Sequence, residues 1–189
     1  FEKTEFTYLA DGTAPFFNPL IETNIFTYDG DASGKRVKST TEYDAYANNT
    51  KGTNFGEVNI TTGADISTSD NIIGFAEYIN NTTNWLLGFP KRTWSTTNDG
   101  ITKIAEAWMY YDNQAYNSIG TKGLLTKEEK ALVFTQGSTS NPTVTMSYDS
   151  YGNMTSVTDA RSITTSTYFD PTYRFLPVKT IDATGDSVR

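Results

Sequence analysis

Residues 147–159 read Ser-Tyr-Asp-Ser-Tyr-Gly-Asn-Met-Thr-Ser-Val-Thr-Asp. Just before this stretch, Val144, Met146 and Tyr148 alternate with Thr and Ser residues, which is the period-2 pattern of a half-buried strand. The carboxylate of Asp149 can accept hydrogen bonds from backbone N–H groups two residues ahead, and a Gly-Asn pair tolerates positive φ at low cost. The stretch therefore predicts a β-hairpin with a tight turn.

The pattern continues after this hairpin. Residues 159–162, Asp-Ala-Arg-Ser, predict a second turn before a strand over Ile163 to Phe169. The pair Phe169-Asp170 then repeats the aromatic-Asp pair Tyr148-Asp149. A short unit that recurs in this way is typical of repeat architectures, in which each unit buries its apolar face against its neighbours.

The unit aromatic-Asp-x-Tyr-Gly-Asn, followed by a polar strand and another turn, resembles the tyrosine–aspartate (YD) repeat of Rhs proteins. Residues 84–93, 110–112, 123–127 and 168–180 narrow the resemblance to the repeat region of toxin-complex B components and their SpvB-like relatives. The resemblance covers most of the chain and is strongest from Asn84 onward. It departs where Ala47-Asn48 replaces Gly-Asn, and in the longer loop after Tyr173. The matching positions are Tyr43, Asp44, Tyr111, Asp112, Tyr148, Asp149, Gly152, Asn153, Phe169 and Asp170.

The resemblance implies an all-β fold in which consecutive antiparallel hairpins form part of a larger curved sheet or shell. It also implies a structural, non-catalytic role, because in these families the repeats enclose a toxic C-terminal polypeptide. The implied partners are the rest of the shell, the enclosed toxin polypeptide and other toxin-complex subunits. The implied location is secreted or on the bacterial cell surface. The family's self-cleaving aspartate site has no matching motif here, so no catalytic residue is assigned.

The length and composition agree with one β-rich region. A chain of 189 residues is long enough to bury a core, and it contains 12 Tyr and 11 Phe. It begins in a strand pattern without Met, so we expect residues 1–189 to be one repeat region of a much larger chain. We expect the strands at residues 6–8 and 176–181 to be open sheet edges.

The composition also limits the chemistry. Cys and His are both absent, which removes disulfides, a thiol nucleophile and the commonest general base and metal ligand. The net charge of −7 is dispersed without a basic stripe, which argues against nucleic-acid binding. No apolar run approaches the length of a membrane span. We therefore expect no cofactor, no metal and no membrane insertion.

Further strands are predicted along the chain. Residues 25–43 predict a long hairpin, residues 58–60 and 72–78 predict strands, and residues 101–112 predict a long strand after the turn Asn98-Asp99-Gly100. Residues 126–129, Thr-Lys-Glu-Glu, fit either a capping box that opens a short helix through Phe134 or a strand. The strand is favoured because the apolar residues 131–134 are contiguous and form no helical stripe.

The turn that begins at Asp29 resembles the first half of a calcium loop. Acidic residues stand at its positions 1 and 3, Ser33 at position 5 and Gly34 at position 6. Position 12, where a bidentate Glu is usual, is Thr40. A plain Asp/Gly turn is favoured, and calcium binding at Asp29–Ser33 stays an open alternative.

Residues 85–90, Trp-Leu-Leu-Gly-Phe-Pro, form the most apolar short run, so we expect Trp85 and Leu87 to be buried in the core. A carbohydrate-binding module or adhesin is the alternative function, since five aromatic residues offer a sugar-stacking platform. Core packing and cross-strand pairing are favoured for these aromatics. The five are Trp85, Trp94, Trp108, Tyr110 and Tyr111.

An enzyme is the third hypothesis. A glycosidase requires two converging carboxyl groups, but the spacing of Glu57, Glu77 and Glu106 pairs no two of them, so solvated strand carboxylates are favoured. Adjacent residues of a strand point to opposite faces, so a Tyr-Asp pair cannot converge on one substrate. The pairs are therefore expected to be structural: the Tyr buries a ring and the Asp caps the turn.

Overall fold

The computed structural model describes residues 1–10, 12, 17–30 and 33–188. The described chain is all-β, and its only helix is a three-residue 3-10 turn, η1 (Thr68–Asp70). The strands are β1 (Glu2–Tyr8), β2 (Leu20–Thr27), β3 (Lys35–Tyr43), β4 (Asn49–Val58), β5 (Ile72–Asn81), β6 (Leu86–Thr96), β7 (Lys103–Tyr111), β8 (Leu125–Lys130), β9 (Thr143–Tyr148), β10 (Met154–Thr158), β11 (Thr164–Phe169), β12 (Pro177–Ile181) and β13 (Ser187–Val188).

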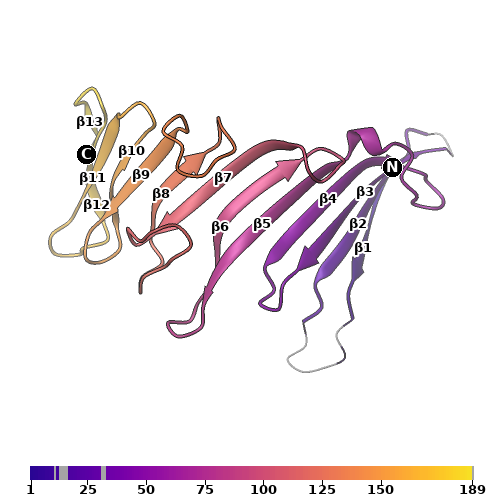
Figure 1. The fold of residues 1–189 in the computed structure, drawn as a ribbon, viewed down its shortest axis with the longest axis horizontal. Coiled ribbons are helices and arrows are strands. Elements are labelled where there is room, and N and C mark those ends of the chain that lie inside the picture. Colours follow the sequence, from indigo (N-terminus) through magenta and orange to yellow (C-terminus); the bar gives the residue numbers. More distant parts are fainter. Residues whose placement is uncertain (11, 13–16, 31–32, 189) are drawn as a thin grey trace. The chain divides into compact units, whose positions relative to one another are not determined.

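The order of the strands in the sheet is their order in the sequence. The 13 strands form one open sheet from β1 to β13, and the described pairings are antiparallel (Figure 1). Every connection therefore joins neighbouring strands, which keeps the entropic cost of closing each loop small. The prediction of consecutive antiparallel hairpins is confirmed.

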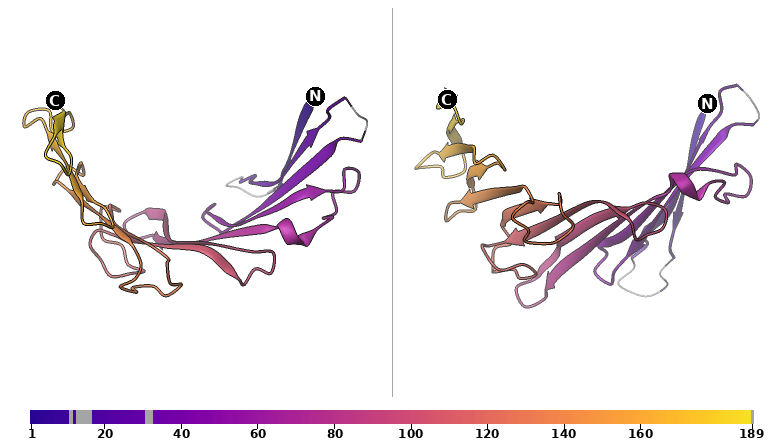
Figure 2. Two further views of the ribbon diagram at one scale, coloured as in Figure 1. Left: turned by 90° about the horizontal axis from the view of Figure 1, so that it is seen from above. Right: turned by 45° about the horizontal axis from the view of Figure 1, so that its top comes forward.

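The chain divides into two compact units. The first contains Phe1–Glu77 and Thr93–Glu106, and the second contains Tyr78–Arg92 and Ala107–Arg189. In the first unit, β1 to β4 pair in sequence order, as the labels of Figure 1 show, and Figure 2 gives two further views of the ribbon. In the second unit, β8 to β13 follow the same rule.

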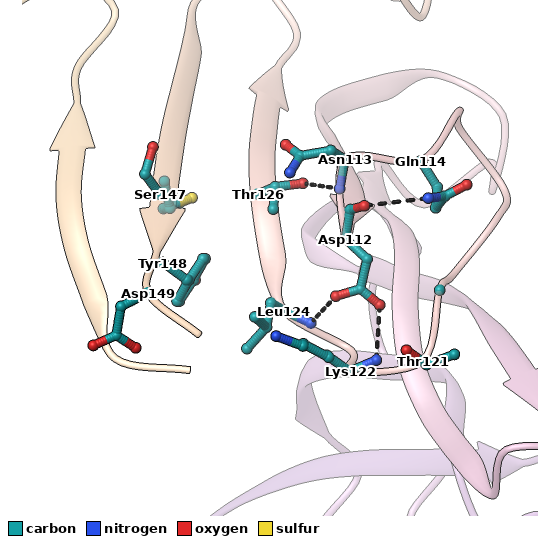
Figure 3. Close-up of a pocket in the computed structure, with 12 residues that line it drawn as sticks. Asp112, Asn113, Gln114, Thr121, Lys122, Leu124, Thr126, Ser147, Tyr148 and Asp149 are labelled. Carbon is teal, nitrogen blue, oxygen red and sulfur yellow. Dashed lines mark hydrogen bonds between the residues drawn. The ribbon is translucent and has the colours of Figure 1, made fainter. Parts of the chain in front are cut away.

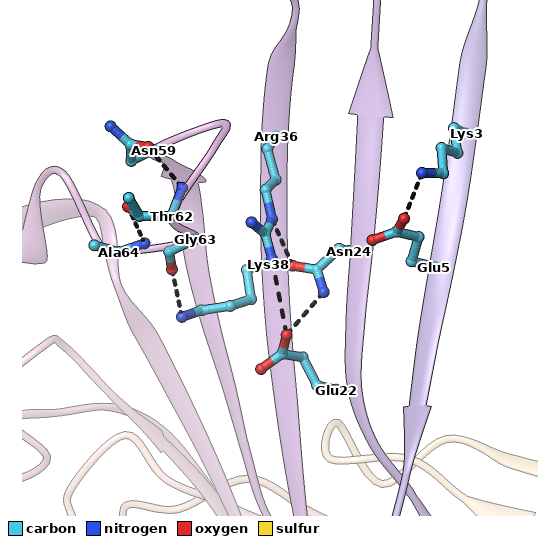
Figure 4. Close-up of polar contacts among 10 residues, drawn as sticks. All are labelled: Lys3, Glu5, Glu22, Asn24, Arg36, Lys38, Asn59, Thr62, Gly63 and Ala64. Carbon is cyan, nitrogen blue, oxygen red and sulfur yellow. Dashed lines mark hydrogen bonds and ion pairs between the residues drawn. The ribbon is translucent and has the colours of Figure 1, made fainter.

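One face of the first unit is held by polar side chains (Figure 4). The Arg36 side chain donates from Nε to Asn24 Oδ1 at 2.9 Å, and Asn24 Nδ2 donates to Glu22 Oε1 at 2.8 Å. The Arg36 guanidinium also lies 5.2 Å from the ring centre of Phe26, a cation–π distance. Asn24 and Phe26 are both buried, and the side-chain oxygen and nitrogen of Asn24 both have hydrogen-bond partners.

The connection after β4 reaches back to the same face. Lys38 Nζ donates to the carbonyl oxygen of Gly63 at 2.8 Å. Gly63 has φ +67°, and a Cβ there would lie 2.7 Å from the Arg36 guanidinium. The positive φ favours glycine at position 63, and a Cβ there would also have to displace the end of the Arg36 side chain.

The core of the second unit is centred on β7. Four consecutive residues are buried there: Trp108, Met109, Tyr110 and Tyr111. Consecutive strand residues point to opposite faces, so β7 is covered on both. Long connections supply part of the cover, since Tyr116 packs on Tyr110 with ring centres 5.6 Å apart.

Several predicted elements match the structure and several do not. The hairpin at residues 25–43, the strand at 72–78 and the strand reading of residues 126–129 are confirmed by β2 and β3, β5 and β8. The strand expected at residues 58–60 is wrong, because β4 ends at Val58 and the next residues form a turn. Most of β4 was missed, since its Gly, Asn and Thr residues lack a clear apolar period.

The expected edges are half right. β1 is the first strand of the described sheet and is exposed along its whole length. Residues 177–181 form β12, but β13 pairs with β12, so β12 is not the edge strand of the described sheet.

Trp85 corrects the largest burial expectation. Its side chain is 77% exposed, and Leu87 is only partly buried. Trp85 has φ +55° in the turn between β5 and β6, so the apolar run is split: Trp85 belongs to the turn and Leu86 begins the strand. Hydropathy alone cannot locate that boundary, because both sides of it are apolar.

Candidate functional site: aspartate-capped turns and the pocket beside Asp112

The turn after Tyr148 is closed by the carboxylate of Asp149. Its Oδ1 accepts from the backbone N–H groups of Tyr151 and Asn153, both at 2.9 Å, and its Oδ2 accepts from Asn153 Nδ2 at 2.8 Å. Gly152 donates its N–H to the Asp149 carbonyl at 3.2 Å and has φ +87°. This is a three-residue hairpin loop whose last residue is left-handed. The predicted turn is confirmed.

The turn after Tyr43 has the same bonds. Asp44 Oδ1 accepts from Tyr46 N at 2.8 Å and Asn48 N at 2.9 Å, and its Oδ2 accepts from Asn48 Nδ2 at 2.9 Å. Ala47 occupies the left-handed position with φ +66°. The turn therefore forms although Ala-Asn replaces Gly-Asn, but Ala47 must adopt a positive φ, which is unfavourable for alanine.

Two further turns repeat this geometry. Asp159 accepts from Arg161 N at 2.8 Å and Ile163 N at 3.0 Å, and Ser162 takes the left-handed position. Asp182 accepts from Thr184 N at 2.9 Å and Asp186 N at 3.0 Å. The Asp159 turn was expected from the sequence, whereas the Asp182 turn was missed. The signal that finds all four is Asp followed three residues later by a small residue.

The aspartates of the two longer connections also cap backbone groups. Asp170 Oδ1 accepts from Thr172 N at 2.7 Å and Tyr173 N at 2.8 Å, and its own N–H donates to Leu176 O. Asp112 reaches further: its carboxylate accepts from Lys122 N at 3.1 Å and from Gly123 N and Leu124 N at 2.8 Å (Figure 3). Asp112 thereby closes the long connection between β7 and β8.

The tyrosines of the motif have a role that the sequence did not reveal. Each donates its hydroxyl to a backbone carbonyl of the preceding strand or its start: Tyr43 to Leu20, Tyr111 to Pro90 and Tyr148 to Leu125. The distances are 2.9, 2.7 and 2.7 Å. The Tyr hydroxyl thus ties its strand to the previous one. Phe169, which stands at the same position of the motif, has no hydroxyl and cannot make this bond.

The electrostatics follow from these bonds. The hydrogen bond from the Asn153 side chain, with backbone N–H donors, lowers the pKa of Asp149. Burial opposes ionisation of Asp112, but the N–H groups of Gly123, Leu124 and Lys122 together lower its pKa. Burial raises the pKa of Tyr111 to about 12 and also raises the pKa of Tyr148. The aspartates are therefore held as anions and the tyrosines as neutral donors.

A pocket of about 610 Å³ lies beside Asp112 and reaches Tyr148 and Asp149 (Figure 3). Lys122, Thr126 and Ser147 are among the polar residues that line it. The carboxylates at its rim already accept backbone hydrogen bonds, and the Tyr148 hydroxyl donates to Leu125. The Asp112 and Asp149 carboxylates and the Tyr148 hydroxyl are thus held in place by backbone hydrogen bonds, and the two carboxylates hold the loops that follow them.

The described residues contain no group of three or more acidic side chains that could hold a metal ion. Asp31 and Ala32 of the calcium-like turn lie outside the described residues, so that alternative is left as it stood. No helix among the described residues is long and apolar enough to cross a bilayer.

The three glutamates considered for catalysis have different surroundings. Glu57 is exposed and lies 3.4 Å from Lys35 Nζ. Glu106 corrects the expectation of a solvated carboxylate: its side chain is buried and pairs with Lys103 Nζ at 2.7 Å. Glu77 is partly buried on β5.

The five aromatics do not form one platform. Trp108, Tyr110 and Tyr111 are buried, and Trp94 stacks on Phe75 with ring centres 4.9 Å apart and planes at 11°. This matches the favoured reading of core and cross-strand pairing. Trp85 alone among the five is largely exposed.

A buried carboxylate was missed by sequence reasoning. Glu129 is 1% exposed, and its Oε1 accepts from Gly137 N at 2.7 Å and Asn141 Nδ2 at 2.8 Å. Its Oε2 accepts from the Tyr110 hydroxyl at 3.0 Å. These bonds order the connection between β8 and β9, and the run Lys-Glu-Glu-Lys gave no sign of which carboxylate turns inward.

The comparisons with known proteins agree on the fold. The chain is similar to solved structures of TcdB2-TccC3 and of TcdB2-TccC3-Cdc42, each with a TM-score of 0.52 and 14% identity. It is also similar to a mutant Tc holotoxin pore of Photorhabdus luminescens, with a TM-score of 0.53 and 13% identity. The matches cover 98–99% of this chain but only 14–15% of those chains. No family model and no curated protein matches the sequence.

Proposed function

We propose that this chain is a structural, non-catalytic segment of an Rhs-type or toxin-complex shell that encloses and helps to deliver a toxic polypeptide. One observation carries the proposal: strands that pair strictly in sequence order, with the same aspartate cap and tyrosine tether recurring at their turns. A catalytic group is needed once, whereas a device that closes turns is needed at each of them.

The mechanism is containment. A continuous hydrogen-bonded sheet leaves no gap between its strands, and each added hairpin extends the wall without new chemistry. The likeness to Tc toxin chains supports this role through the fold. The proposed partners are the rest of the shell, the enclosed polypeptide and other toxin-complex subunits, and the proposed location is secreted or on the bacterial surface.

The proposal is tested on the complete reading frame that contains this chain. We expect electron microscopy to show a hollow particle with this segment in its wall, and the enclosed polypeptide to resist added protease. In a matched variant, a protease recognition sequence inserted into the turn at residues 150–152 should open the wall and make the polypeptide digestible after cleavage.

The same insertion into a connection outside the wall is the control and should leave protection intact. A particle without an internal cavity would refute the shell role. So would a polypeptide that is digested equally fast before and after the wall is cut.

A further inference from the structure

The turn between β5 and β6 displays a tryptophan. Trp85 is 77% exposed, whereas Trp108 is buried and Trp94 is stacked on Phe75. Its side chain makes no hydrogen bond or ring contact with the described residues. An exposed, isolated indole is a poor contribution to stability, because a large apolar surface stays in water.

The backbone of Trp85 adds a second cost. Its φ of +55° lies in the left-handed region. A residue with a Cβ is disfavoured there by about 1–2 kcal/mol relative to glycine. Ala47 and Ser162 take the same conformation in their turns, so this backbone is set by the turn, and it is the exposure of the indole that points to a binding role.

The turn is held firmly around this residue. Asn81 Oδ1 accepts from Asn84 N at 3.0 Å, and Asn80 Oδ1 accepts from Gly88 N at 2.8 Å. Asn84 Nδ2 also donates to Gly120 O at 3.4 Å, which links the turn to the connection closed by Asp112. The loop that carries the indole is therefore held by hydrogen bonds, so binding a ligand would cost little conformational entropy of the loop.

The turn itself is neutral and polar. Thr82, Thr83 and Asn84 are exposed beside it, and residues 79–90 contain no charged side chain. The hydroxyls of the threonines, the Asn81 Nδ2 group and the Asn84 Oδ1 atom make no other hydrogen bond with the described residues. They offer both donors and acceptors next to a flat aromatic face.

We propose that this turn is a contact site for neutral oligosaccharides, with Trp85 as the stacking residue. A pyranose has one face of C–H groups that suits the indole and a rim of hydroxyls that suits amides and threonines. A protein partner is less well matched, because aromatic hot spots are usually surrounded by contacts that exclude water, and here the neighbours are exposed and polar. The site is independent of the proposed shell role.

The test uses the 189-residue chain and three neutral probes: cellohexaose, chitohexaose and maltohexaose. At least one should shift the NMR signals of the backbone amides of residues 81–86 and move the tryptophan emission to shorter wavelength. Trp85→Ala should weaken that binding about tenfold or more, while Trp85→Tyr should keep most of it.

Tyr151→Ala is the matched control, since Tyr151 is another exposed aromatic on a turn, and it should leave the affinity unchanged. Trp85→Asn tests folding separately, because Asn tolerates positive φ and should give an unchanged or higher melting temperature. The proposal is overturned if none of the probes shifts residues 81–86 at millimolar concentration, or if Trp85→Ala binds as well as the unmodified chain.

Discussion

The turn at Asp149 and the connection at Asp112 use the same pair of residues for loops of very different length. Asp149 caps N–H groups two and four residues ahead, whereas Asp112 caps N–H groups ten to twelve residues ahead. In both, the preceding Tyr is tied to the previous strand. The pair therefore specifies how a strand ends, and it leaves the length of the loop open.

The two places also differ in how tightly their glycines are enclosed. A Cβ on Gly152 would meet nothing closer than Leu124 Cδ2 at 3.9 Å, whereas a Cβ on Gly123 would lie 2.6 Å from the Phe89 ring. Both glycines have positive φ. The short turn thus requires glycine for its backbone alone, and the long connection requires it for backbone and space.

The largest expected effect sharpens this contrast. Gly123→Ala should destabilise the chain by about 2–5 kcal/mol, since the left-handed cost adds to overpacking against Phe89. Gly152→Ala should cost only about 1–2 kcal/mol. Urea unfolding of both variants checks the prediction, and equal losses would mean that the Phe89 ring moves aside freely.

The next largest effect is expected in the stability at alkaline pH, which should differ between the hydroxyl bonds of Tyr111 and Tyr148. The pKa of Tyr111 in the folded chain is about 12, above the unfolded value of roughly 10. Its contribution to stability is therefore complete below pH 10 and is lost as the pH rises to about 12.

Tyr111→Phe should remove this part of the alkaline loss while costing about 1 kcal/mol at neutral pH, because the Pro90 carbonyl loses its donor. Tyr148→Phe is the control with a less buried ring, and its effect should be smaller. Thermal melts from pH 7 to pH 12 measure both. An alkaline limb unchanged in Tyr111→Phe would assign the loss to another group.

A smaller effect, of opposite sign, is expected at Asp44. Ala47 stands where the Asp149 turn has Gly152, so Ala47→Gly should stabilise the chain by about 0.5–1 kcal/mol. Ala183→Gly is the control, since this alanine is not among the positive-φ residues and should lose stability or stay unchanged. A destabilised Ala47→Gly would show that the Asp44 turn is not limited by its backbone.

The smallest expected effect is the loss of stability at acid pH that the capping aspartates cause. Hydrogen bonding lowers the pKa of Asp149, Asp159 and Asp182, so their contribution is present above the unfolded value of about 3.9 and declines as the pH falls through the lower folded values. Asp149→Asn should reduce the acid dependence of the melting temperature slightly. An unchanged pH profile in a combined Asp149→Asn and Asp182→Asn variant would contradict this account.

The sequence predicted best where local chemistry decides the structure. The Asp149 turn, the hairpin at residues 25–43 and the strand over 126–129 follow from residues that act on their immediate neighbours. The same reasoning failed at Trp85 and Glu129. Their placement depends on where a turn begins and on a connection that folds back, and neither leaves a mark on hydropathy or charge.

The site was predictable in part for the same reason. The aspartate caps are local and were expected, whereas the tyrosine hydroxyls act across strands on carbonyls more than twenty residues away. A backbone acceptor carries no sequence signature. Neither Asp159 nor Asp182 follows an aromatic residue, so the aromatic-Asp pair marks neither turn, and the spacing from Asp to a small residue three positions later marks both.

The strict sequence order of the strands bears on how such a chain is made. Sheets are usually slow to form because distant segments must find each other, whereas here each strand needs only the one synthesised just before it. A chain that emerges from the ribosome can complete each hairpin while the next is still being translated. Assembly can therefore proceed vectorially, and apart from the free side of β1 the unpaired strand edge of the described sheet is the one at the growing end.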